Sequence, residues 1–209
     1  MIEPQDHILF FGDSITDAGR NRDAPAGDSG GWGGGYVHQI AAYLGAQDPA
    51  DELIFTNKGI SGNRVTDLEK RLKTDVLDEE PDIVSILIGI NDVWRRYDAD
   101  VVSHADEFEA AYRRILKKIS KDGARLILLE PFLLPVPEDR RAWREDLDPK
   151  IHIVRDLARE FEATLVPLDG IFAAASAKRE PAFWASDGVH PSPAGHALIA
   201  RAWIDAMEA

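Results

Sequence analysis

The sequence predicts a single α/β domain spanning residues 1–209, in which a five-stranded parallel sheet forms the middle of three α/β/α layers. Short apolar segments alternate with longer segments whose apolar residues recur at helical spacing. The short segments are continuously apolar, as in parallel strands that are covered on both faces. No internal repeat, low-complexity linker or change of composition divides the 209 residues, a length that fits one domain.

Five apolar segments are the expected strands. In chain order they are "HILFF" (7–11), "LIFTN" (53–57), "DIVSILIG" (82–89), "RLILLEP" (125–131) and "ATLVPL" (163–168). The expected helices lie between and after them, over residues 34–45, 66–77, 103–123, 139–162 and 192–207. Ser103 is expected to cap the third helix and Gly123 to end it, while Pro193 suits the first turn of the last helix. The Pro-rich, then charged segment 132–146 is expected to run over the surface.

Composition and charge exclude several classes of function. A net charge of −13 argues against nucleic acid or an anionic membrane as the main partner. No run of 18 apolar residues predicts a transmembrane helix, and the first residues lack the pattern of a signal peptide, so we expect a cytoplasmic protein. The absence of cysteine excludes disulfides, thiolate catalysis and cysteine metal sites. A homo-oligomer remains open.

Polar turns that contain glycine follow three of the expected strands. They are "GDS" (12–14), "KGISGN" (58–63) and "GIND" (89–92), and a fourth, "SDGVHP" (186–191), precedes the last helix. Each turn alone is better explained by a structural role, which is a helix cap, a turn glycine or, for Asp187 and His190, a hydrogen bond that stabilises the loop. In an open parallel sheet, however, ligands bind beyond the carboxyl ends of the strands, so the four turns together predict one site at that edge.

The residue types in these turns suit nucleophilic catalysis by a serine. A serine nucleophile needs a base, an acid that orients the base, and donors for an oxyanion. Asp187 and His190 stand three apart in one loop, so the carboxylate can hold Nδ1 while Nε2 faces outward. The N–H of Gly62, the side-chain amide of Asn91 and the N–H of Ser14 itself are candidate oxyanion donors.

The four blocks, in this order and over nearly the whole chain, resemble the SGNH (GDSL) hydrolases. The resemblance implies the flavodoxin-like fold of that family. It also implies Ser14 as nucleophile, His190 as general base and Asp187 as orienting acid, with Ser14, Gly62 and Asn91 forming the oxyanion hole. No cofactor is implied.

Three longer segments are similar to the intracellular acetyl-xylooligosaccharide esterases of that family: "NKGISGN", "SILIGINDVWRRYD" and "DGVHPSPAGH". This similarity implies a serine esterase that removes acetyl groups from xylooligosaccharides or other acetylated carbohydrates through an acyl-enzyme. The partner would be a small-molecule ester or an acetylated oligosaccharide. The alternatives are a lysophospholipase or acyl-CoA thioesterase with the same triad, and a carbohydrate-binding protein without catalysis.

Four further residues are candidate substrate contacts: Asp13, Trp94, Arg95 and Trp184. An exposed indole face suits the C–H groups of a sugar, whereas a buried indole belongs to the core. Arg95 either reaches a substrate hydroxyl or pairs with Asp98.

Other motifs are weaker candidates. His196 lies close enough to His190 in the sequence to be an alternative base, and is otherwise a surface or supporting residue of the last helix. The glycine-rich segment "GGWGGG" (30–35) lacks the Lys-Ser/Thr ending of a phosphate-binding loop. No HExxH motif or histidine cluster predicts a metal site.

Overall fold

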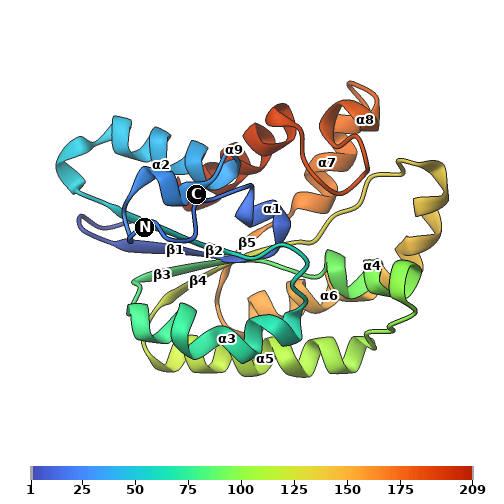
Figure 1. Ribbon diagram of the computed structural model, residues 1–209, viewed down its shortest axis with the longest axis horizontal. Coiled ribbons are helices and arrows are strands. Elements are labelled where there is room, and N and C mark those ends of the chain that lie inside the picture. Colours follow the sequence, from blue (N-terminus) through green and yellow to red (C-terminus); the bar gives the residue numbers. More distant parts are fainter. Residues whose placement is uncertain (1, 209) are drawn as a thin grey trace.

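The strands form one parallel sheet in the order β2-β1-β3-β4-β5, as described for residues 2–208 by a computed structural model (Figure 1). Their bounds are β1 (His7–Gly12), β2 (Ile54–Gly59), β3 (Ile83–Leu87), β4 (Arg125–Leu129) and β5 (Thr164–Val166). All five predicted strands are confirmed. This order is the flavodoxin-like one, in which the connections change direction between β1 and β3 and open a crevice at the carboxyl ends of those strands.

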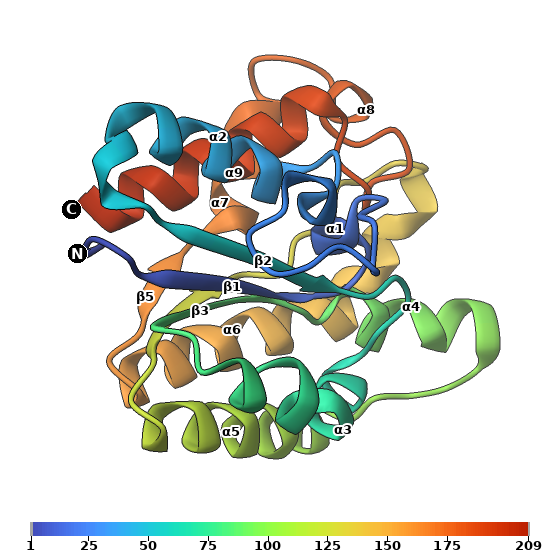
Figure 2. The same ribbon diagram turned by 60° about the vertical axis from the view of Figure 1, so that its left-hand side comes forward.

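Helices cover both faces of the sheet, which confirms the predicted three-layer α/β fold (Figures 1 and 2). The upper layer contains α2 (Tyr36–Gln47), α7 (Leu168–Ser176), α8 (Pro181–Trp184) and α9 (Pro193–Glu208). The lower layer contains α3 (Val65–Asp75), α5 (Ala105–Lys121) and α6 (Arg144–Glu160). The remaining helices are α1 (Ser14–Asp17), after β1, and α4 (Ile90–Ala99), after β3. The short 3₁₀ turns are η1 (Ser29–Trp32), η2 (Pro49–Asp51), η3 (Leu77–Glu79) and η4 (Glu138–Trp143).

Strand β1 shows why the strand segments are continuously apolar. Successive side chains of a strand point to opposite faces. Ile8 and Phe10 therefore enter the core beneath α2 and α9, while Leu9 and Phe11 enter the core against α3 and α5. All four are fully buried, so each layer of helices has its own apolar contact with the sheet.

Two details of the helices differ from the sequence predictions. The helix expected at 103–123 begins at Ala105 with His104 as its N-cap, and Ser103 does not cap it. Instead the Ser103 hydroxyl donates to the buried carboxylate of Asp92. A buried carboxylate without a hydrogen-bond donor costs more free energy than a helix without a side-chain cap. Helices α4, α7 and α8 were not predicted, and the first residues of α4 resemble a polar turn.

None of the helices within residues 2–208 combines the length and apolar character needed to cross a membrane. This finding agrees with the absence of a long apolar run in the sequence.

Gly59, the last residue of β2, allows α1 to pack against the sheet. A Cβ atom at this position would lie 2.2 Å from the backbone N of Asp17 and 2.6 Å from the carbonyl carbon of Thr16. We expect Gly59→Ala to lower the free energy of unfolding by about 1–3 kcal/mol, because the helix must move away from β2. Urea denaturation followed by circular dichroism measures this difference.

Gly45→Ala provides the matched control for that substitution. Gly45 lies exposed in α2, and nothing lies within 4 Å of a Cβ built there. Alanine should stabilise the helix at this position by roughly 0.5–1 kcal/mol. Equal stabilities of the Gly59→Ala variant and the unsubstituted protein would contradict the proposed close packing.

Candidate active site

Helix α1 follows β1 at the carboxyl end of the sheet (Figure 2), and Ser14 is its first residue. The register places Gly12 of β1 beside Gly59 of β2 and Leu87 of β3, so the turns that follow these three strands meet at one edge. Asp13 is the N-cap of α1, and its carboxylate accepts a hydrogen bond from the N–H of Ile15 at 3.0 Å. The half-exposed Ser14 is therefore the first residue of a short, firmly capped helix.

A continuous chain of hydrogen bonds joins Ser14, His190 and Asp187. Ser14 Oγ lies 2.9 Å from His190 Nε2, and His190 Nδ1 lies 2.7 Å from Asp187 Oδ2. The other carboxylate oxygen of Asp187 accepts hydrogen bonds from the N–H groups of Val189 and His190, at 2.9 and 2.8 Å. The structure thus brings Ser14 to a pair of residues more than 170 positions away in the chain, with the carboxylate held in place by its own loop.

This loop requires glycine at position 188. Gly188 has φ of 79°, in the left-handed region, and a Cβ there would lie 2.4 Å from the carbonyl oxygen of Leu134. Leu134 N–H also donates to the Gly188 carbonyl at 2.9 Å. The loop that carries Asp187 and His190 is therefore attached closely to the segment after β4.

Hydrogen bonding sets the charges of this pair. The hydrogen bond to Asp187 raises the pKa of His190 above its ordinary value of 6.5, although partial burial opposes the shift. Partial burial would raise the pKa of Asp187, but the hydrogen bonds from the His190 side chain and two backbone N–H groups outweigh it and hold that pKa well below its usual range. Asp187 is consequently a permanent carboxylate that stabilises a protonated imidazole.

The three predicted oxyanion donors lie in the turns after β1, β2 and β3. One N–H of the Asn91 amide donates to the carbonyl of Asn63 at 3.0 Å, and Nδ2 makes only a long contact of 3.4 Å with Asp13. Gly62 has φ of 83°, a conformation that favours glycine, and it neighbours Asn63. Ser14 is the first residue of α1, where the backbone N–H has no partner within the helix. All three groups can donate to a ligand oxygen.

Asp13 does not have the position expected of a substrate contact. Its side chain is fully buried, and burial raises its pKa to about 7. Its carboxylate caps α1 through Ile15 and faces the amide of Asn91. We therefore reassign Asp13 from the substrate contacts to the groups that support α1 and Asn91.

Trp94 and Arg95, both on α4, lie beside the proposed catalytic groups. The ring centroids of Trp94 and His190 are 5.8 Å apart. Arg95 pairs with Asp98, as one of its two sequence interpretations stated. A Cβ built on Gly62 would lie 3.6 Å from Arg95 Nη2, so the same guanidinium is also next to Gly62.

Trp184 and His196 have structural contacts of their own. The indole N–H of Trp184 donates to the carbonyl of Arg179 at 3.2 Å, and its ring packs edge-on against Phe183 at 5.0 Å. His196 Nδ1 accepts from the N–H of Tyr36 at 3.2 Å, and burial lowers the pKa of His196 to about 4. A half-buried neutral imidazole that already accepts from the backbone is a support for the start of α2, so His190 is the better candidate base.

The sequence analysis missed two residues near Trp94. Arg140 and Trp143 lie in η4, within the segment expected to run over the surface, and the Arg140 guanidinium carbon is 4.4 Å from the Trp94 ring centroid. The Trp143 ring is 5.5 Å from the Trp94 ring. No spacing rule relates residues that far apart in the chain, so no signal in one sequence indicated this cluster.

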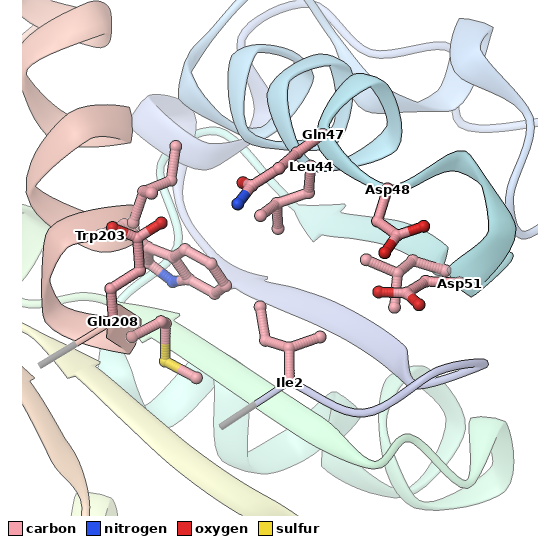
Figure 3. Close-up of a pocket in the computed structure, with 10 residues that line it drawn as sticks. Ile2, Leu44, Gln47, Asp48, Asp51, Trp203 and Glu208 are labelled. Carbon is pink, nitrogen blue, oxygen red and sulfur yellow. The ribbon is translucent and has the colours of Figure 1, made fainter.

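Two further features bear on ligands. Within residues 2–208 no group of three or more histidine, aspartate or glutamate side chains could hold a metal ion. A cavity of about 700 Å³ lies between the ends of α2 and α9, near both chain termini and away from α1 (Figures 2 and 3). Ile2, Leu44 and Trp203 are among its lining residues, and none of the lining residues belongs to the Ser14–His190–Asp187 group.

Comparison with known proteins places this geometry in a family. Residues 10–198 match the model of the GDSL-like lipase/acylhydrolase family. The chain belongs to this family. The fold and site described above thus belong to a carboxylic ester hydrolase, which confirms the resemblance that the sequence blocks indicated.

Individual relatives of this hydrolase are similar over almost their whole length. An acetylxylan esterase from Geobacillus stearothermophilus is 39% identical over 201 residues, which cover 94% of this chain and 91% of that protein. Its solved structure, named Axe2, has a TM-score of 0.91 and 38% identity, with 99% of this chain and 95% of that chain covered. A structure from Parabacteroides merdae, described as a GDSL-like lipase, has a TM-score of 0.95 and 33% identity, with 100% and 98% covered.

Three solved structures of the Geobacillus esterase are catalytic mutants. In them a serine, an aspartate or a histidine is replaced by alanine, and the aspartate and histidine stand three positions apart. Asp187 and His190 of this chain have the same spacing.

Proposed function

We propose that this ester hydrolase removes acetyl groups from acetylated carbohydrates, with xylooligosaccharides as the favoured class, and that Ser14, His190 and Asp187 are its catalytic triad. The observation that carries the proposal is the unbroken chain of hydrogen bonds from Ser14 Oγ through both ring nitrogens of His190 to Asp187. This arrangement has the donors and acceptors that activate a serine hydroxyl.

The first half of the reaction forms an acyl-enzyme. Ser14 Oγ attacks the carbonyl carbon of the ester while His190 Nε2 takes the hydroxyl proton. Asp187 stabilises the resulting imidazolium. The negative oxygen of the tetrahedral intermediate accepts hydrogen bonds from the N–H groups of Ser14 and Gly62 and from the Asn91 amide. The C–O bond to the sugar then breaks, and the sugar hydroxyl leaves with the proton from His190.

The second half of the reaction releases acetate. A water molecule gives a proton to His190 Nε2 and attacks the acetyl carbon bound to Ser14. The same three donors hold the second oxyanion. Collapse of this intermediate restores the Ser14 hydroxyl with the proton from His190, so each turnover consumes one water and needs no cofactor.

Two observations favour an acetylated carbohydrate over a long-chain lipid ester. The His190 side chain is 47% exposed, so the triad is open to water, as a hydrophilic alcohol requires. Trp94 offers a half-buried aromatic ring 5.8 Å from the His190 ring, and aromatic faces suit the C–H groups of sugars. The acetylxylan esterase at 39% identity supports the same substrate class.

Acetate release from acetylated xylooligosaccharides tests the proposal. We expect fast release by the purified protein and none above background by the Ser14→Ala variant. Hydrolysis of p-nitrophenyl acetate without release of acetate from the oligosaccharides would be consistent with the proposed triad. It would refute acetylated xylooligosaccharides as the substrate. Comparing p-nitrophenyl acetate with the octanoate ester would then indicate whether a lysophospholipase or acyl-CoA thioesterase activity takes its place.

The pH dependence of the reaction follows from the pKa of His190. Protonated His190 cannot take a proton from Ser14, and the hydrogen bond to Asp187 raises the pKa of His190 above 6.5. We therefore expect kcat/KM to fall as the pH drops, with the midpoint of the acid limb above pH 6.5. A pH profile with p-nitrophenyl acetate measures that midpoint.

Asp187→Asn provides the control for this assignment. The substitution removes the carboxylate that raises the pKa of His190, so the acid limb of the remaining activity should move to lower pH. An acid limb that stays in place in this variant would show that another group controls the profile.

A further inference from the structure

Arg140 lies between two indole rings next to the proposed catalytic base. Its guanidinium carbon is 4.4 Å from the centroid of the Trp94 ring and 4.6 Å from that of Trp143. The Trp94 ring also contacts His190, with 5.8 Å between centroids. A single aromatic side chain therefore separates the Arg140 cation from the imidazole that would take the proton of Ser14.

Within the described residues, Arg140 lacks the carboxylate partner that its arginine neighbours have. Its Nη1 atom is buried and has no hydrogen-bond partner. By contrast, Arg141 pairs with Glu138, and Arg144 pairs with Asp169 and with a second aspartate on α6. A guanidinium that is partly removed from water and has no acceptor is ready to bind an anion.

The surroundings of Arg140 form a small recess. A cavity of about 230 Å³ is lined by Leu133, Pro135, Arg140, Arg141 and Arg144. Three arginines in one recess contrast with the net charge of −13 of the whole chain, which repels anions elsewhere. The indole rings hold the guanidinium in one orientation through cation–π contacts, so little side-chain freedom remains to be lost when an anion binds.

The chemistry of the anion follows from the guanidinium. A planar carboxylate matches two parallel N–H donors of an arginine, whereas a sugar hydroxyl can use only one of them. Trp94 contacts both His190 and Arg140, so a sugar chain whose acetyl ester lies at Ser14 would have to pass Trp94 for a neighbouring sugar to meet Arg140. Only a carboxylate on that neighbouring sugar would form an ion pair with the positively charged guanidinium of Arg140.

We propose that Arg140 is a specificity residue that binds a carboxylate on a sugar next to the acetylated one, so that acetyl esters of acidic oligosaccharides are preferred over neutral ones. The inference rests on the proposed function, because it assumes that a carbohydrate occupies the site. Beyond that function, the inference specifies a carboxylate on the substrate and assigns its recognition to Arg140.

Inhibition by deacetylated sugars tests this inference. The probes are xylotriose and a xylotriose that carries a glucuronic acid branch, each competing with p-nitrophenyl acetate. We expect the acidic sugar to inhibit with a Ki about tenfold lower than that of the neutral sugar, as one charge-assisted contact provides. Raising the salt concentration should reduce that preference, because ions screen exposed charges.

Three variants separate recognition of charge from structural support. Arg140→Met keeps an apolar stem between the rings and should abolish the preference for the acidic sugar, whereas Arg140→Lys should retain part of it. Arg201→Gln is the matched control and should keep the preference in full, since Arg201 lies on α9 outside the recess and pairs with Asp205. Circular dichroism confirms that each variant is folded.

Two outcomes would overturn the inference. One is equal inhibition by the two sugars in the unsubstituted protein. The other is an equal loss of inhibition by both sugars in Arg140→Met, which would make Arg140 only a support for Trp94. Ser14-dependent acetate release from a neutral acetylated xylooligosaccharide tests the proposed function separately, because that substrate has no carboxylate.

Discussion

Replacing Ser14 by alanine should lower kcat on p-nitrophenyl acetate by about 10⁴ or more. The substitution removes the oxygen that would attack the ester, and neither His190 nor Asp187 can form an acyl-enzyme in its place. Ser14 is half-buried and its hydroxyl bonds only to His190 within the described residues, so the fold should remain intact. Steady-state kinetics with a thermal melt of the same preparation measures both effects.

Ser61→Ala is the matched control for Ser14→Ala. Ser61 lies in the turn after β2 at the same edge of the sheet, and its hydroxyl makes only a 3.4 Å contact with Asp17. We expect this variant to keep kcat within about twofold, since surface substitutions have small effects. Unchanged turnover in Ser14→Ala would refute the proposed mechanism.

Replacing Asn91 by alanine should lower kcat by about 10²–10³, because one of the three proposed oxyanion donors is lost. The effect should fall on kcat more than on KM, since the negative oxygen exists only beyond the ground state. Asn91 is buried, and its amide also donates to the Asn63 carbonyl, so some stability is lost as well. Kinetics at saturating p-nitrophenyl acetate, at a temperature well below the melting point, isolates the catalytic effect.

Asn91→Asp distinguishes the donor from the shape of the side chain. Aspartate has nearly the same size but donates no hydrogen bond when ionised, and its charge would repel the oxyanion. Its kcat should therefore fall at least as far as that of Asn91→Ala. A variant with wild-type kcat at either substitution would remove Asn91 from the proposed oxyanion hole.

The strands could be predicted from local pattern because burial on both faces leaves a continuous apolar segment. The helices with a clear apolar stripe, such as α3 and α5, were predicted for the same reason. Helix α4 was missed because its buried residues include Asn91 and Asp92, which a local pattern interprets as a polar turn. The role expected for Ser103 was wrong because the partner of its hydroxyl, Asp92, comes from another element.

The α/β class and the candidates Ser14, Asp187 and His190 could be predicted from the sequence, because the apolar strand segments and each of the four blocks are local patterns. How these candidates differ from their neighbours depends on the tertiary structure. Asp13 is buried at the N-terminus of α1, and the ring of His196 stacks on that of Tyr36. The residues around a side chain come from elements that are far apart in the chain. A local sequence pattern does not show how such elements pack together.

The Arg140 cluster is the clearest case of that dependence. Trp94 belongs to α4 and Arg140 to η4, and they meet because the segment after β4 returns across the carboxyl edge of the sheet. In the sequence, Arg140 is one of several charged residues in the segment 132–146, which was expected to run over the surface but in fact buries Phe132, Leu133, Leu134 and Trp143. Its proximity to His190 exists only once the sheet, α4 and η4 have packed together.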